Sequence, residues 1–333
     1  MAAAAGTVGR TFRPLSDRIL EQTHGPRALW IAAWAAVPWI NAALNLALGV
    51  ENASPVWEQD PVLIVLNYAA VSFAVAMSLW GTTRIARGLE DLLRTPSGSM
   101  VGQATAMFRG VNSRGGPVAA SVAASVVFGL SSTIRDGWTA GLLRGATWFV
   151  LGVALFSFVW TYGSLLLGLD RLGRERLVPD PVHVDPGLGL RPLGGIAATG
   201  LWMLLIWLVP VLLTGLPDVV GAVTGMLVLV AVLAAFFLSL FRLHRQMVEV
   251  KTDELAIARG LYAQAYEPVH RARTLEALEA QRALLGAADA LEKRASAIHE
   301  WPFTERTPTL VITIATSVTA MTIGRLILDP LGL

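Results

Sequence analysis

The residues that could carry chemistry in this chain are few, and three of them share one loop. His183, Asp185 and Arg191 lie in a Pro- and Gly-rich stretch that reads VPDPVHVDPGLGLRP. An imidazole and a carboxylate two residues apart could bind a cation, or they could hold the loop by hydrogen bonds. Two ligands of mixed type are too few for a zinc site. We therefore interpret the three residues as an inner loop clasp.

Two further groups resemble catalytic or metal-binding motifs without completing them. Glu267 and His270 have the Glu-x-x-His spacing of di-iron bundles, but Pro268 interrupts the pattern and only one copy exists. His299-Glu300 lacks the second His of a zinc-peptidase helix. The chain has no Cys, which excludes thiolate sites and Cys nucleophiles. We predict that the protein is not an enzyme and binds no metal or cofactor.

The elements that must position these residues are membrane helices. Hydrophobic residues make up 54% of the chain and charged residues 15%, whereas a soluble domain carries about a quarter charged residues. A bilayer core about 30 Å thick needs roughly 20 helical residues to cross it. Seven stretches have this character, and they predict an all-α polytopic membrane protein with seven transmembrane helices. They are Ala28–Val50, Pro61–Thr83, Pro117–Ile134, Gly145–Leu167, Leu193–Leu216, Asp218–Phe241 and Pro308–Leu328.

The distribution of positive charge predicts the orientation of these helices. Of the 26 Lys and Arg residues, 23 lie before the first stretch or in every second connection after it. Cytoplasmic segments carry such an excess, so we expect the N-terminus inside and the C-terminus outside. The basic residues orient helices and need no nucleic-acid partner. Arg outnumbers Lys 24 to 2, which suggests a bacterial source, so we expect a multi-pass protein of the plasma (inner) membrane.

The spans divide the chain into four parts. Residues 1–27 form a cytoplasmic N-terminal segment, and the first span is too long for a cleaved signal peptide, so we expect an uncleaved anchor. Residues 28–241 form a six-helix bundle of three hairpins. Residues 242–300 form cytoplasmic amphipathic helices that make a helical hairpin, and residues 301–333 carry the seventh transmembrane helix.

Two details of the spans predict local structure. Pro38 in the first span and Pro210 in the fifth each remove a backbone hydrogen bond, so both helices should bend there. The third span is rich in small residues, which let neighbouring helices approach closely. We therefore expect this helix to be central in the bundle, with its contacts made by Ala119, Ala120, Ala123 and Ala124.

The long inner segment carries an apolar seam. Its hydrophobic side chains step by three and four residues, which is a heptad pattern. The sixth helix should continue into the cytoplasm until Pro268 ends or turns it, and a second amphipathic helix should follow at Thr274–Ile298. These helices can bury their stripes against each other, against Arg-rich helix ends, or against another subunit. We expect a homo-oligomer or inner seam formed by Leu243, Met247, Val250, Ile257 and Leu261.

The last span has one polar face. Thr and Ser hydroxyls and small residues share about a quarter of its circumference, opposite a wholly apolar side. Such a stripe could line a modest pore, or it could be a closely packed helix face. The residues of this face are Thr309, Thr313, Thr316, Ser317, Ala320 and Gly324.

Two resemblances bear on function. The loop from His183 through Asp185 to Gly187 resembles a His-x-Asp-Pro-Gly loop before a span in uncharacterised bacterial polytopic membrane proteins. In topology alone the chain is similar to the insect-chemoreceptor-like channels. That superfamily has seven helices, an internal N-terminus, a cytoplasmic helical anchor and a tetrameric pore lined by the last helix. The second resemblance implies an oligomeric channel.

Three functions are compatible with the sequence. The first is an oligomeric, poorly selective ion channel with the seventh helix lining the pore. The second is a non-conducting membrane scaffold or sensor whose cytoplasmic helices bind a partner. The third is a transporter, although transporters usually have charged or broken helices at mid-membrane, and these spans have few. The expected partners are the lipid bilayer and further copies of the chain.

Overall fold

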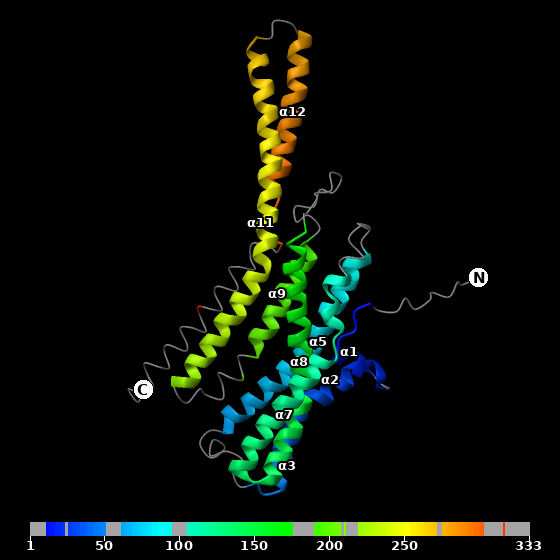
Figure 1. Cartoon of the computed structure of the whole chain (residues 1–333), viewed down its shortest axis with the longest axis vertical. Coiled ribbons are helices and arrows are strands. Elements are labelled where there is room, and N and C mark those ends of the chain that lie inside the picture. Colours follow the sequence, from blue (N-terminus) through cyan, green and yellow to red (C-terminus); the bar gives the residue numbers. More distant parts are fainter. Residues whose placement is uncertain are drawn as a thin grey trace, which may run out of the picture.

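The computed structural model is a long helical molecule in which every described regular element is a helix (Figure 1). It describes residues 11–23, 26–50, 61–94, 105–175, 190–207, 210, 219–271, 275–302 and 316. The helices are α1 (Leu15–Gln22), α2 (Arg27–Ala35), α3 (Val37–Ala47), α5 (Pro61–Arg94), η1 (Arg109–Asn112), α7 (Gly115–Asp136), α8 (Trp138–Leu172), α9 (Arg191–Ile206), α11 (Val219–Arg271) and α12 (Leu275–Ala297).

Four of these helices are long and apolar enough to cross a membrane, and the bent pair α2 and α3 would make a fifth. The four lie in α5, α7, α8 and α11, so the chain is a multi-pass membrane protein. Helix α9 has 16 residues and ends at Ile206, and the rest of the predicted span Leu193–Leu216 falls almost wholly outside the described part. The predicted span Pro308–Leu328 also lies outside it, apart from Thr316. The count of seven therefore stays a prediction.

The bend predicted at Pro38 is confirmed. Helices α2 and α3 meet at Ala36 with a change of direction of 43°. Pro38 is in the first turn of α3, where a missing backbone N–H leaves no helical bond unmade. The bend predicted at Pro210 adjoins residues outside the described part.

Helices α7 and α8 form an antiparallel hairpin joined by Gly137, whose φ of +87° favours glycine. Small residues let the two backbones touch. A Cβ on Gly129 would lie 3.2 Å from the Gly141 carbonyl oxygen and 3.3 Å from Gly145 Cα. The Ser125 hydroxyl donates to the Gly145 carbonyl at 2.7 Å. This small-residue seam holds the hairpin together.

The seam is not the one that the sequence predicts. Of the four predicted alanines, Ala119 and Ala123 are exposed and Ala120 and Ala124 are half-buried, whereas Ser121, Gly129 and Ser132 are buried. Helix α7 is also peripheral, since it packs chiefly on α8 and leaves valine side chains exposed along its length. The central position expected for this helix was therefore wrong. Alanine is small but apolar, so it tolerates lipid contact, while hydroxyl and glycine positions gain more from a neighbouring backbone.

A core of large side chains joins the upper half of α8 to α5, α9 and α11. Phe158, Leu165 and Leu169 of α8 are fully buried at its centre. Ile85 of α5, Leu193 of α9 and their neighbours pack around them in one hydrophobic cluster. The Tyr162 hydroxyl in this core donates to the Ala197 carbonyl at 3.1 Å, so its polar atom is satisfied.

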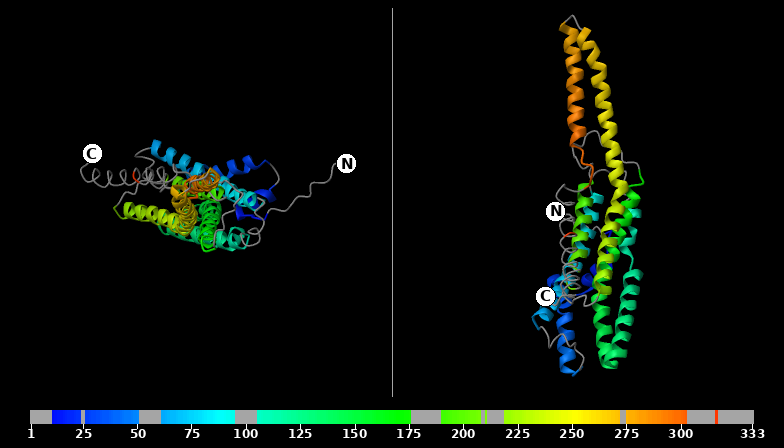
Figure 2. Two further views of the ribbon diagram at one scale, coloured as in Figure 1. Left: turned by 90° about the horizontal axis from the view of Figure 1, so that it is seen from above. Right: turned by 90° about the vertical axis from the view of Figure 1, so that its left-hand side faces the viewer.

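Helix α11 is a single helix of 53 residues, about 80 Å long. The prediction that it continues past Phe241 is confirmed, but it also continues past Pro268 and ends at Arg271. Helix α12 returns antiparallel beside it, and the two project far beyond the other helices as a stalk (Figures 1 and 2). We use the name stalk for residues 250–271 of α11 together with α12.

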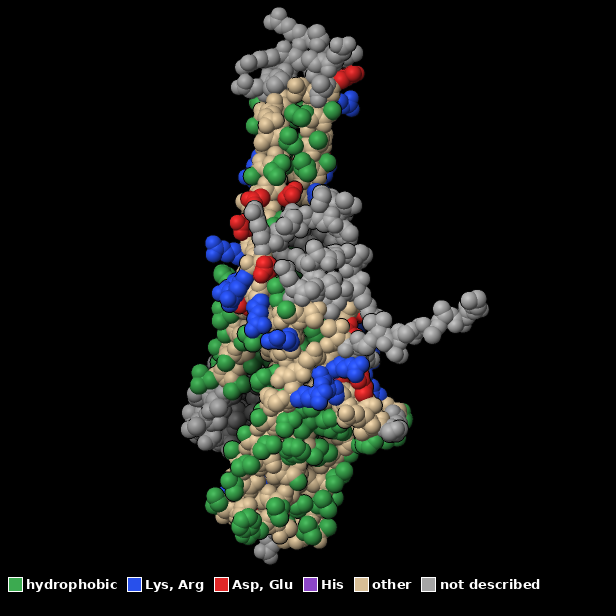
Figure 3. Space-filling model, turned by 45° about the vertical axis from the view of Figure 1, so that its right-hand side comes forward, with side chains coloured by type: hydrophobic (Ala, Val, Ile, Leu, Met, Phe, Trp, Pro, Cys, Tyr) green, Lys and Arg blue, Asp and Glu red, His purple; other side chains and the backbone are tan. Residues whose placement is uncertain are grey.

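The surface divides into two kinds. Large hydrophobic side chains are exposed along α5, α7, α8 and the first part of α11, among them Phe73, Val127 and Leu227. On the face in Figure 3, they cover the lower part of the molecule below a group of Lys and Arg side chains. An exposed apolar belt of this extent is compatible with embedding in a lipid bilayer.

Candidate functional sites

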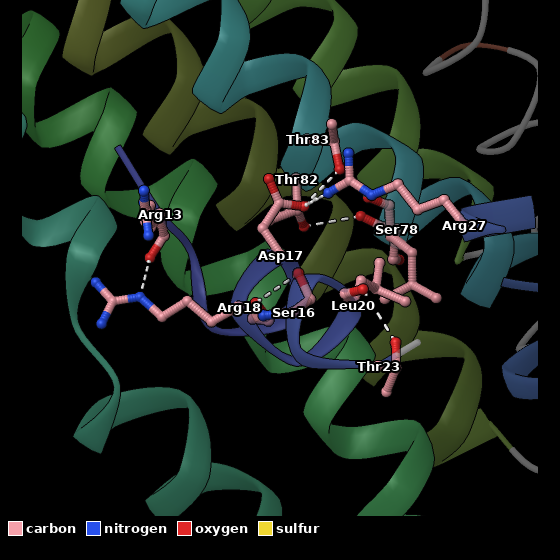
Figure 4. A network of polar contacts seen from close by, with 12 residues as sticks. Arg13, Ser16, Asp17, Arg18, Leu20, Thr23, Arg27, Ser78, Thr82 and Thr83 are labelled. Atoms are coloured by element: carbon pink, nitrogen blue, oxygen red, sulfur yellow. Dashed lines mark hydrogen bonds and ion pairs between the residues drawn. The ribbon is translucent and has the colours of Figure 1, made fainter. Parts of the chain in front are cut away.

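A buried ion pair docks the N-terminal helix α1 on the bundle (Figure 4). The side chain of Asp17 is 2% exposed, and its Oδ1 accepts a hydrogen bond of 2.6 Å from the Thr83 hydroxyl of α5. The Arg27 guanidinium at the start of α2 donates to the same oxygen at 2.7 Å. A buried carboxylate needs such partners, because removing it from water is costly. Asp17 thus ties α1, α2 and α5 together.

Two further contacts extend this docking to α8. The backbone N–H of Ser16 donates to the Ser157 hydroxyl at 3.1 Å, and the two hydroxyls lie 3.1 Å apart. Ahead of α1, the Phe12 ring is fully buried in the large core, and its backbone N–H approaches Glu90 Oε1 at 3.4 Å. The residues from Phe12 to Leu20 are therefore part of the folded bundle.

Asn112 of η1 clamps the chain just before α1. Its side-chain oxygen accepts from the Arg13 backbone N–H at 2.6 Å, and its amide donates to the Thr11 carbonyl at 2.9 Å. The Arg18 guanidinium donates to the Arg13 carbonyl at 2.7 Å and to the Asn112 carbonyl at 3.4 Å. Two segments about a hundred residues apart are thereby held in register.

Sequence reasoning missed this site because the buried face of α1 is not apolar. Ser16, Asp17 and Leu20 are its buried residues, so hydrophobic periodicity does not mark it. The available signal was the acidic Asp17 so close to the first apolar stretch, with Arg27 at the border of that stretch. A carboxylate in that place needs a partner if the chain folds back on the bundle.

A second polar group lies at the base of the stalk, where α12 ends beside α11. The His244 ring stacks on the Trp301 ring with centroids 4.1 Å apart, and its Nδ1 donates to the Glu300 carbonyl at 2.7 Å. Lys251 pairs with the Glu300 carboxylate at 3.1 Å. These contacts return the chain to α11 at the end of the hairpin.

Arg191 of the predicted loop clasp belongs to this second group. Its guanidinium donates to His299 Nε2 at 3.3 Å. His183 and Asp185 lie outside the described residues, so the clasp itself stays a prediction. Among the residues that the structure describes, no three His, Asp or Glu side chains gather as metal ligands would.

The predicted heptad seam is only partly the seam that the structure has. Leu243 and Met247 are fully buried, and Val250 and Leu261 are half-buried. Ile257, however, is 56% exposed, so it lies outside the packed seam of the single chain. Its other reading, a contact with a second subunit, stays a prediction.

Alanines take the place of the large residues between α11 and α12. Ala258 and Ala265 on α11 and Ala288 and Ala295 on α12 are all fully buried. Each pair is seven residues apart, which places both members on the same side of their helix. The buried track is rotated by one residue from the predicted one, because Ala lets the two helices approach more closely than Leu or Ile would.

The predicted pore-lining face falls almost entirely outside the described residues. Thr316 is helical and exposed. Thr309, Thr313, Ser317, Ala320 and Gly324 lie outside the described part, so the pore hypothesis stays a prediction.

Comparisons with known proteins do not assign a family. No family model, no curated protein and no solved structure matches the chain. The resemblances to bacterial polytopic membrane proteins and to insect-chemoreceptor-like channels therefore stay expectations.

Proposed function

We propose that this chain is a membrane scaffold that assembles with further copies of itself through its stalk. The observation that carries the proposal is that α11 has two apolar tracks and that α12 covers only one of them. The alanine track faces α12. The second track is defined by Leu243, Val250 and Ile257, which are seven residues apart, with Leu261 beside them.

The second track is continuous with the core of the bundle. Leu243 is fully buried, Val250 is half-buried and Ile257 is 56% exposed, so the track emerges from the core and runs out along the stalk. Ile257 lies about 100° around the helix from Ala258. The next position of the series is Gln264, so the stripe is short, and a short apolar stripe on an otherwise polar helix is a surface on which a second helix packs. A second copy of the chain presents the same stripe, and two-fold association would bury both.

We place the stalk in the cytoplasm, since the positive charge of the connections predicts this orientation. The chain has no Cys, so a single introduced cysteine can show on which side of the membrane its part of the molecule lies. Thr139 is exposed just after the α7–α8 turn, and Ala256 is exposed on the stalk. An impermeant thiol reagent should label Thr139→Cys in intact cells, and Ala256→Cys only after permeabilisation. The reverse pattern would overturn the orientation.

The double variant Ile257→Glu and Leu261→Glu tests the assembly. The Ile257 side chain is 56% exposed and Leu261 is half-buried beside the alanine seam, so the single chain should fold with some loss of stability while the oligomer dissociates, since carboxylates buried between copies would be unpaired. The mass of the purified protein in nanodiscs, measured by light scattering, gives the oligomeric state. Ala256→Glu, an exposed position one residue away, is the matched control and should keep the parent mass.

Two results would contradict the proposal. The parent protein could be monomeric in nanodiscs, or the double variant could keep the parent mass. Planar-bilayer recordings on the same preparation separate the scaffold from the channel hypothesis. A scaffold passes no current under voltage or tension, whereas currents that disappear with the double variant would favour the oligomeric channel.

A further inference from the structure

Three arginines that form no ion pair within the described residues lie near one another where α1 and the segment before it contact η1, just ahead of α7. They are Arg13, Arg18 and Arg114, and the Asn112 clamp holds the first two beside the segment that carries the third. None of the ion pairs within the described residues involves any of the three. Burial lowers the pKa of Arg18, and the positive charges of Arg114 and Arg13 lower it further, while Glu21 opposes them. Arg13 and Arg114 therefore both act on Arg18 as like charges.

The position of the cluster points to lipid. Helix α7 descends from Arg114 with Val118 and Val122 exposed, 38% and 46% respectively. The Trp160 ring of α8 lies across Gly116, two residues from Arg114, and is 42% exposed. Tryptophan is enriched where apolar membrane surface meets headgroups. A group of basic side chains stands above the hydrophobic surface of the face in Figure 3.

We propose that Arg13, Arg18 and Arg114 bind the phosphate of an anionic phospholipid, with the acyl chains lying along the exposed valines of α7. Arginine guanidinium groups bind phosphate oxygens in bidentate geometry, and a phosphate relieves the repulsion that Arg13 and Arg114 exert on Arg18. The hydrogen bonds of Arg18 to the Arg13 and Asn112 carbonyls hold its guanidinium in place before the lipid arrives, which lowers the ordering cost of binding. The lipid would secure α1, and with it Asp17, on the bundle.

The double variant Arg13→Gln and Arg114→Gln tests the site without disturbing the clamp. Arg13 contributes to the clamp through its backbone N–H and carbonyl alone, and no hydrogen bond of the described residues uses the Arg114 side chain. Native mass spectrometry of the full chain with added phosphatidylglycerol measures the affinity for the first bound lipid. Each basic residue near an anionic surface is worth about five-fold in affinity, so the double variant should bind about thirty-fold more weakly.

The controls distinguish the effect of side-chain charge from the effect of the lipid headgroup and from binding of a free anion. Arg13→Lys with Arg114→Lys should recover most of the affinity, and Arg259→Gln, an exposed arginine of the stalk, should leave it unchanged. Phosphatidylcholine should bind weakly to all variants. An unchanged affinity in the double glutamine variant, or equal binding of the two lipids by the parent protein, would overturn the site. Complete displacement of phosphatidylglycerol by millimolar inorganic phosphate would assign the cluster to a free anion instead.

Discussion

The α7–α8 hairpin and the α11–α12 stalk are both closely packed helix pairs, but the surface of the first is suited to lipid and that of the second to water. Both are antiparallel helix pairs joined through small residues, Gly129 and Gly145 in one and Ala258 and Ala295 in the other. Their outer faces differ. The first exposes Val126, Val127 and Leu130, while the second exposes charged side chains such as Arg259 and Lys293.

The seam and the outer face of a helix pair carry separate information. The outer face reports the surroundings, because exposed apolar surface is stable against lipid and charged surface against water. The seam reports only how closely two helices pack. Glycine and serine allow backbone contact in the membrane pair, where hydrophobic burial gives no driving force, whereas alanine suffices in the stalk, where burial from water adds to packing.

The largest effect is expected for Gly129→Leu in the membrane seam. Its side chain would meet backbone atoms of Gly141 and Gly145, which cannot rotate away. We expect a loss of about 3 kcal/mol in stability, seen as a lower midpoint of unfolding in an SDS titration followed by tryptophan fluorescence. Gly163→Leu on α8 is the control, since nothing lies within 4 Å of a Cβ there. Equal midpoints for the two variants would show that the seam does not hold the hairpin.

A smaller and local effect is expected for Ala258→Leu in the stalk. The added side chain would push α12 away, at a cost of about 2 kcal/mol. Hydrogen exchange should accelerate in α12 and the outer part of α11, while α7 and α8 keep their protection, because the stalk projects beyond them. Ala256→Leu, at an exposed position two residues away, should leave exchange unchanged. Acceleration throughout the chain would mean that the stalk and the bundle unfold together.

The smallest effect is expected for Ser125→Ala, which removes the hydroxyl that donates to the Gly145 carbonyl. A hydrogen bond between membrane helices contributes about 0.6 kcal/mol, so the SDS midpoint should fall slightly. Ser121→Ala is the comparison, because the Ser121 hydroxyl donates to the Pro117 carbonyl of its own helix. A larger loss of stability for Ser121→Ala than for Ser125→Ala would show that the interhelical hydrogen bond does not stabilise the hairpin.

The sequence predicts the parts of this fold that depend on long-range averages. Hydropathy locates α5, α7, α8 and α11, and proline chemistry locates the bend at Ala36. It does not decide which of two adjacent residues of a helix faces the neighbouring helix. Ile257 and Ala258 both fit a heptad, and only contact with α12 decides that the alanine is the buried one.

The site at α1 was beyond the same reasoning for a different reason. Asp17 is buried by partners far along the chain, such as Thr83, and no local pattern marks the pairing. The clamp by Asn112 is equally non-local. Residues that bury polar groups against distant partners have no periodicity to detect, so only the assembled fold reveals them.

The central claim is that the track through Ile257 faces a second copy of the chain. Since the chain has no Cys, a single introduced cysteine can form no disulfide within the chain, and a cross-linked product with the mass of two chains reports contact with another copy. Under mild oxidation in native membranes, Ile257→Cys should give a covalent dimer on non-reducing gels, and Ala258→Cys, buried against α12, should stay monomeric. Efficient cross-linking at Ala258→Cys with none at Ile257→Cys would contradict the account.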